Sequence, residues 1–166
     1  MPIILGIDPG SRITGYGVIA SEGNRHRYIA SGCIKTNADT MAERLHQVYS
    51  GISDIITQYR PVESGVEEVF LNKNVNSALK LGQARGAALV AIAAQSVAVA
   101  EYTPRKIKQA VVGYGGAEKH QVQHMIKLLL NLSELPQQDA ADALAVALCH
   151  AHSRGVIGYK SYEVVA

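Results

Sequence analysis

Three short apolar segments near the N-terminus predict a three-stranded antiparallel meander. The first segment, residues 3–8, is a continuous apolar run that ends at a Pro-Gly turn. Segments 13–20 and 27–36 are rich in β-branched and aromatic residues, and the polar turn 21–24 separates them. Strands that are joined by such short polar turns pair with their neighbours in antiparallel order.

The middle of the chain alternates between helical and extended patterns. From residue 41 to residue 59, apolar side chains recur at spacings of three and four, which predicts an amphipathic helix that stops before Pro61. We expect a fourth strand at 65–70 and a fifth at 97–102. Residues 76–95, between these strands, form a predicted helix that is small and apolar nearly all round, which implies burial on more than one side.

The last third predicts three helices, at 104–112, 117–130 and 137–152. A meander followed by alternating helices and strands is typical of an α/β fold, here with a five-stranded mixed sheet of three antiparallel and two parallel strands, flanked by helices. We expect a single domain over residues 1–153 and a poorly ordered tail over residues 154–166.

Composition places the chain among globular proteins. Its 166 residues are 48% hydrophobic and 18% charged, which suits one ordinary domain with a sizeable core. Two cysteines, Cys33 and Cys149, are too few for a disulfide framework or a four-ligand zinc site, which favours a reducing compartment. The start of the chain lacks the basic region of a signal peptide, and the longest strongly apolar run, 86–94, is far shorter than the roughly 20 residues that span a bilayer. We therefore expect a cytoplasmic protein with no membrane contact.

Positive charge is concentrated in one part of the chain. Residues 73–127 contain eight basic and two acidic residues, a balance of +6, so the remainder carries −4 of the total of +2. This asymmetry suits a protein that binds a polyanion on one side and keeps carboxylates elsewhere. A solvated helix face would explain the same charges equally well.

Five carboxylates interrupt or border apolar segments. Asp8 ends the first strand, Glu67 and Glu68 lie in the fourth, and Asp139 and Asp142 lie three residues apart in the last helix, on one face. Carboxylates beside apolar residues are costly unless they are neutralised, and hard divalent cations such as Mg²⁺ do this with oxygen ligands. The charge of four carboxylates would balance the charge of two such ions. Two divalent ions can stabilise both the attacking and the leaving oxygen during cleavage of a phosphodiester.

Each acid also has an ordinary structural explanation. Asp8 could initiate the turn that follows it, Asp139 could favour the helix N-terminus, and Asp142 could simply be solvated. Only one of Glu67 and Glu68 can face the site, because neighbouring strand residues point to opposite faces, so either could be the solvent side. The order of the acids along the chain, one at the first strand end, one in the fourth strand and a pair on the last helix, is nevertheless the pattern of ribonuclease-H-like nucleases.

Longer motifs make the resemblance specific. The chain resembles the RuvC family of Holliday junction resolvases from Ile3 to His152. The matching segments are 4-ILGIDPGSRITGYGV-18, 67-EEVF-70, 74-NVNSALKLGQARGAALVA-91, 108-KQAVVGYGGAEKHQVQHM-125 and 136-PQQDAADALAVALCHAH-152. The resemblance implies a ribonuclease-H-like fold and a homodimer that cleaves four-way DNA junctions, in recombination and repair, as a Mg²⁺-dependent crossover junction endodeoxyribonuclease. It also implies partnership with the branch-migration proteins RuvA and RuvB.

The resemblance also implies which residues perform the reaction. The acids that would bind two Mg²⁺ ions per active site, with Mn²⁺ substitution left open, are Asp8, Glu67, Asp139 and Asp142. Of the adjacent glutamates, Glu67 falls at the family's acidic position. The catalytic set is completed by Lys108 and Lys119, which match basic residues near the cleaved strand. The expected products are paired, symmetric nicks with 5′-phosphate and 3′-hydroxyl ends, and predicted helix 76–95 is the expected dimer interface.

Three further residues are expected to contact DNA. The family counterpart of Phe70 resembles an aromatic that stacks on an unpaired base near the crossover, a contact worth about 1–3 kcal/mol per base. A core position at the strand end would also suit this residue. Lys73 and Asn74, in the loop after the fourth strand, are further candidates for DNA contacts, together with Lys108 and Lys119.

Other functions fit the sequence less well. His120 and His124 have the spacing of a zinc-protease helix, but Gln121 stands where that motif needs a glutamate base. His150 and His152 are expected to be helix-terminus or surface residues. A sugar-kinase or actin-type phosphotransferase would need two such domains. A ribonuclease-H-like nuclease for another nucleic acid, and a non-catalytic junction-binding module, remain alternatives that a junction cleavage assay separates.

Overall fold

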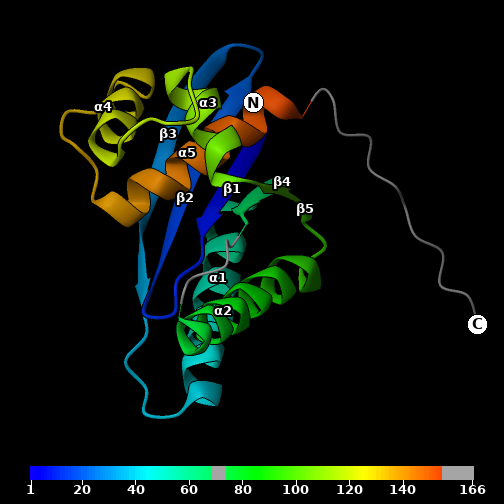
Figure 1. Cartoon of the computed structure of the whole chain (residues 1–166). Helices are drawn as coiled ribbons and strands as arrows, with labels where there is room; N and C mark the ends of the chain where they lie inside the picture. The colour runs from blue at the N-terminus through cyan, green and yellow to red at the C-terminus, as the bar shows by residue number, and fades with distance from the viewer. Residues whose placement is uncertain (69–73, 155–166) are drawn as a thin grey trace, which may run out of the picture.

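The computed structural model describes residues 1–68 and 74–154, which form one five-stranded mixed sheet with helices on both faces (Figure 1). The strand order is β3-β2-β1-β4-β5. Strands β1 and β2 and strands β2 and β3 pair antiparallel, whereas β1 and β4 and β4 and β5 pair parallel. The strands are β1 (Ile3–Asp8), β2 (Ile13–Glu22), β3 (Arg25–Lys35), β4 (Glu63–Glu67) and β5 (Ala98–Tyr102). The predicted meander and parallel pair are therefore confirmed.

Two helices cover one face of the sheet and three cover the other (Figure 1). The first face carries α1 (Met41–Tyr59) and α2 (Val75–Ala94), and the second carries α3 (Pro104–Val112), α4 (Lys119–Leu129) and α5 (Gln138–Ser153). The alternation of side chains along β1 explains the two layers, because Ile4 packs into the core under α3, α4 and α5 while Leu5 packs into the core under α1 and α2. All five helices fall within two residues of their predicted ends.

The fourth strand starts earlier than predicted, at Glu63 instead of residue 65. The sequence there looks unsuited to a central strand, but the tertiary contacts explain each residue. Ser64 donates its hydroxyl to the carbonyl oxygen of Ala98 on β5, at 2.9 Å. A Cβ on Gly65 would lie only 3.1–3.2 Å from side-chain atoms of β5 and α5, so glycine suits the crowded position. Burial against neighbouring elements has overridden a weak local strand preference.

Helix α5 is the most buried helix of the described chain and lies directly on β1 and β2. Every residue from 140 to 151 except Asp142 is buried. The close approach requires glycines on the sheet, because a Cβ on Gly6 would lie 2.1 Å from the carbonyl oxygen of Ala143, and one on Gly15 would lie 2.0 Å from that of Asp139. The first turn of α5 is thereby held over the carboxyl end of β1.

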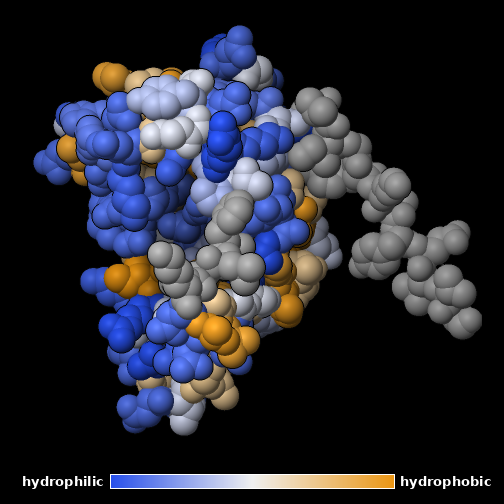
Figure 2. Space-filling model, viewed as in Figure 1, coloured by the Kyte–Doolittle hydropathy of each residue, from blue (hydrophilic) through white to orange (hydrophobic). Residues whose placement is uncertain are grey.

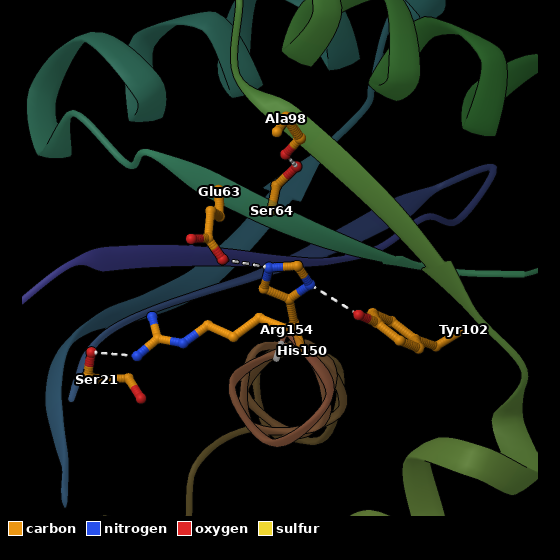
Figure 3. Close-up of polar contacts among 7 residues, drawn as sticks. All are labelled: Ser21, Glu63, Ser64, Ala98, Tyr102, His150 and Arg154. Carbon is orange, nitrogen blue, oxygen red and sulfur yellow. Dashed lines mark hydrogen bonds and ion pairs between the residues drawn. The ribbon is translucent and has the colours of Figure 1, made fainter. Parts of the chain in front are cut away.

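A buried polar network joins α5 to the two parallel strands, contrary to the prediction for His150. This side chain is fully buried, and it bonds Glu63 Oε2 at 2.7 Å and the Tyr102 hydroxyl at 2.8 Å (Figure 3). The carboxylate can only accept, so Nε2 donates to it and Nδ1 accepts from Tyr102. The expectation of a terminal or surface position holds for His152, which is exposed at the helix end. Sequence periodicity could not reveal a partner 87 residues away.

Three other expectations can be compared with the fold. Helix α2 buries Ala84 and Ala88 within this chain, whereas several of its larger apolar residues are exposed, so burial on a second side is not provided by the described residues. The predicted disordered tail lies, apart from Arg154, outside the described residues. Within the described part of the chain, none of the helices combines the length and the apolar character needed to cross a membrane.

Candidate active site

The two strand-borne acids lie side by side at one edge of the sheet. Asp8 is the last residue of β1, and Glu67 is the last residue of β4. These strands are parallel neighbours, with Ile7 opposite Val66, so their carboxyl ends reach the same edge. Crevices at the carboxyl ends of parallel strands are common ligand sites in α/β proteins. The predicted choice of Glu67 agrees with this position, since Glu68 lies beyond the strand end.

Helix α5 brings the remaining two acids to the same edge. Asp142 lines a pocket together with Asp8 and Glu67. Asp139 lies one turn earlier and does not line the pocket, although its charge acts on both Asp8 and Asp142. One of its oxygens, Oδ2, accepts a hydrogen bond from Gln137 Nε2 at 2.7 Å.

The pocket has a volume of about 330 Å³ and combines acids, lysines and an apolar wall. Lys108 comes from α3 and Lys119 is the first residue of α4, so two helices supply the positive charge. The apolar wall consists of Pro104, Ile107, Val122 and Ala145. Five of the six predicted catalytic residues therefore meet in one pocket, although they come from five different elements.

Burial and mutual repulsion perturb the carboxylates strongly. Burial raises the pKa of Asp8, and a hydrogen bond to Glu67 together with the charge of Glu67 raises it further. Burial also raises the pKa of Glu67, although the hydrogen bond with Asp8 lowers it. Burial, with repulsion by Asp8, raises the pKa of Asp142 to about 6. Lys119 opposes all three shifts but does not cancel them.

This donor set suits a hard divalent cation. All the acidic ligands are carboxylate oxygens, and a cation between them would offset the burial and the repulsion that raise the pKa of Asp8. As arranged, however, no three His, Cys, Asp or Glu side chains within residues 1–68 and 74–154 are grouped closely enough to hold a metal ion. Asp8 and Glu67 are hydrogen-bonded to each other, so metal binding requires this pair to lose its shared proton and the carboxylates to draw closer.

Of the five predicted DNA-binding residues, Lys108 and Lys119 line the pocket, and two others fall outside the described residues. These two are Phe70 and Lys73. Asn74 is exposed at the N-cap of α2, where its side-chain oxygen accepts a hydrogen bond from the Ser77 amide at 3.2 Å. Its role toward DNA stays a prediction.

Gln137 and Cys33 lie beside the acids of α5, a position near the site that the sequence analysis did not predict for either residue. Gln137 Oε1 accepts a hydrogen bond from the Cys33 thiol at 3.0 Å, which ties β3 to the start of α5. Burial, followed by the charge of Asp139, raises the pKa of Cys33, so the thiol keeps the proton that it donates. The polar Gln137 two residues before Asp139 was a visible signal, but its partner on β3 was not.

One histidine of the pair considered for zinc, His120, contacts an acidic side chain. His120 forms an exposed contact with Glu118, with 3.3 Å between Nδ1 and Oε2. Gln121, which replaces the glutamate of the zinc-protease motif, accepts a hydrogen bond from the Glu118 amide at 2.8 Å and so caps α4.

Comparison with known proteins identifies the family. The model of the crossover junction endodeoxyribonuclease RuvC family matches residues 4–150. A crossover junction endodeoxyribonuclease RuvC from Psychromonas ingrahamii is 61% identical over 164 residues, which cover 99% of this chain and 95% of the relative. The structure of T. thermophilus RuvC in complex with Holliday junction substrate has a TM-score of 0.87 at 36% identity, covering 93% of this chain and 96% of the other.

A solved structure with much lower sequence identity shares the same fold. A yeast mitochondrial Holliday junction resolvase has a TM-score of 0.65 at 13% identity, over 92% of this chain and 83% of that one. The predicted ribonuclease-H-like fold is thus confirmed. With the family model covering most of the chain and a relative matching nearly its full length, this chain belongs to the RuvC family of crossover junction endodeoxyribonucleases.

Proposed function

We propose that this chain cleaves four-way DNA junctions at the pocket formed by Asp8, Glu67 and Asp142, with Asp139 as the fourth acid. The observation that carries the proposal is the meeting of three half-buried carboxylates and two lysines in one pocket of a RuvC-family fold. RuvC-family nucleases depend on divalent metal ions. We propose two Mg²⁺ ions per site, since four carboxylates balance their charge.

The protein's own residues prepare the reaction. Asp8, Glu67, Asp139 and Asp142 would hold the ions once the hydrogen-bonded pair of Asp8 and Glu67 has released its proton. Two bound divalent ions would activate a water and stabilise the attacking and leaving oxygens of the phosphodiester. Lys108 and Lys119 line the same pocket as the acids and would offset the negative charge that develops on the phosphate. The expected products are 5′-phosphate and 3′-hydroxyl ends.

The substitution Asp8→Asn tests this assignment. We expect the variant to bind a synthetic four-way junction with wild-type affinity and to lose Mg²⁺-dependent cleavage, because an amide lacks the negative charge with which a carboxylate binds divalent cations. The matched control is Asp54→Asn, at an exposed position on α1. Cleavage of the junction but not of a linear duplex or an RNA–DNA hybrid supports the substrate class. Wild-type cleavage by Asp8→Asn, or preference for the hybrid, would refute it.

We further propose that the protein acts as a homodimer through the exposed face of α2. Resolving a junction takes two matched nicks, which two sites related by a two-fold axis provide. Val75, Leu79 and Val90 are 71%, 62% and 59% exposed, and a Cβ on Gly82 or Gly86 would meet nothing within 4 Å. Apolar residues gather over α2 in the lower part of the molecule, whereas hydrophilic residues dominate above (Figure 2).

Sedimentation of Leu79→Glu tests the interface. We expect the wild type to sediment as a dimer at micromolar concentration and the variant as a folded monomer, because a carboxylate at this apolar face is costly to bury. Lys80→Glu, at the adjacent exposed position, changes charge off the apolar stripe and serves as the control. A monomeric wild type would contradict the proposal.

The family resemblance supports two further proposals. We expect RuvA and RuvB to act on the same junctions, which co-migration of all three proteins on a four-way junction would test. We place the reaction in the cytoplasm, since both cysteines are free thiols, as a reducing compartment requires. Oxidative pairing of cysteines between copies in purified protein would weaken that placement.

A further inference from the structure

Gln137 contacts three groups at the N-terminus of α5. Its side-chain oxygen Oε1 accepts a hydrogen bond from the Ala140 amide at 3.1 Å and one from the Cys33 thiol at 3.0 Å. Its side-chain nitrogen Nε2 donates to Asp139 Oδ2 at 2.7 Å. One amide thus links β3, the first turn of α5 and an acid of the proposed metal site.

The partners determine the orientation of this amide. The Ala140 N–H can only donate, so it requires the oxygen end of the Gln137 side chain. Asp139 Oδ2 accepts the other hydrogen bond, so it requires the nitrogen end of the Gln137 side chain. A flipped amide would place donor against donor and acceptor against acceptor, and both bonds would be lost.

Glutamine is an unusual residue for this position. N-caps favour Ser, Thr, Asp and Asn, and the caps of α1, α2 and α3 are Thr40, Asn74 and Thr103. Capping alone would not require the longer side chain of Gln137. The additional methylene group lets the amide cap the helix with its oxygen while its nitrogen reaches Asp139.

We propose that Gln137 is a positioning residue that fixes the carboxylate of Asp139 for cation binding, and that the Cys33 thiol anchors the Gln137 amide from β3. The inference rests on the proposed role of Asp139 in the metal site. A charge-assisted hydrogen bond to Oδ2 restricts rotation of the carboxylate and leaves Oδ1 without this amide bond. Partners of metal-binding residues typically change metal affinity or activity 10- to 100-fold when they are removed.

The substitution Gln137→Ser separates positioning from capping. Serine is a favoured N-cap, so the helix keeps its cap, but its side chain is too short to reach Asp139. We expect an unchanged melting temperature, unchanged junction binding in EDTA, and a rise of about 10-fold in the Mg²⁺ concentration that gives half-maximal cleavage. The Mn²⁺ affinity of the DNA-free protein, measured by electron paramagnetic resonance, should weaken by a similar factor.

Matched variants complete the experiment. Gln138→Ser, at the adjacent exposed residue, should leave the Mg²⁺ requirement and the Mn²⁺ affinity unchanged. Cys33→Ala should raise the Mg²⁺ requirement by a smaller factor than Gln137→Ser. Cys33→Ser keeps a hydroxyl donor, so its Mg²⁺ requirement should lie close to that of the wild type.

Two outcomes distinguish failure of the inference from failure of the proposed site. If Asp139→Asn abolishes cleavage while Gln137→Ser keeps the wild-type Mg²⁺ requirement and Mn²⁺ affinity, the positioning role is wrong and the site stands. If Asp139→Asn cleaves like the wild type, the metal role of Asp139 itself is wrong and the inference fails with it.

Discussion

Removing the charge of Asp142 should stabilise the metal-free protein while abolishing its activity. Burial and repulsion by Asp8 raise the pKa of Asp142 from 3.8 to about 6. Each pKa unit corresponds to about 1.4 kcal/mol, so keeping this group ionised at neutral pH costs the fold about 3 kcal/mol. Asparagine has nearly the same shape without the charge. We therefore expect Asp142→Asn to raise the free energy of unfolding by up to about 3 kcal/mol at pH 7.5.

The pH dependence of this effect follows from the direction of the shift. Because the pKa of Asp142 is higher in the folded protein, the folded protein binds this proton more tightly than the unfolded chain. The stabilising contribution is fully present below about pH 3.8 and is lost as the pH rises through about 6. The advantage of Asp142→Asn should therefore be large at pH 7.5 and small at pH 4.5.

Urea denaturation in EDTA at both pH values measures the effect, with the slope of unfolding free energy against urea expected to stay constant. Adding Mg²⁺ should raise the unfolding midpoint of the wild type more than that of Asp142→Asn, because a cation relieves the repulsion only where the charge exists. Asp54→Asn, on the exposed surface of α1, is the control. If Asp142→Asn is no more stable than the wild type at pH 7.5 in EDTA, the ionised carboxylate of Asp142 does not lower the stability of the fold, and the reasoning is refuted.

Three other substitutions test how the fold supports the site. His150→Ala should lose about 1–3 kcal/mol of stability by urea denaturation, because it removes the fully buried side chain that bonds Glu63 and the Tyr102 hydroxyl. In the wild type, burial lowers the pKa of His150, so its stabilising contribution should be lost as the pH falls below about 6.5. Gly15→Ala should abolish cleavage and lower the melting temperature, because its Cβ would strike the carbonyl of Asp139, whereas Gly116→Ala, with open space around it, should do neither. Thr40→Ala should cost about 1 kcal/mol by removing the α1 capping box, with cleavage at the wild-type rate; a change in cleavage would link α1 to the site.

The elements could be predicted where local patterns dominate. The α1 helix, with its apolar spacing and its stop before Pro61, and the three-stranded meander needed only periodicity and turn residues. The start of the fourth strand was predicted two residues too late, because only contacts with β5 and α5 explain why Ser64 and Gly65 lie in a strand. For the same reason the buried position of His150, bonded to residues 48 and 87 positions away, was predicted wrongly.

The sequence by itself determined which chemical groups are available: four acids in the order typical of ribonuclease-H-like nucleases, two lysines, and glycines on the strands beneath α5. The tertiary structure decided which of them meet. Parallel pairing of β1 and β4 places Asp8 beside Glu67, and the close packing of α5 brings Asp142 into the same pocket. It also decided that Asp139 bonds Gln137, because a hydrogen bond depends on distance in space, which a one-dimensional pattern does not contain.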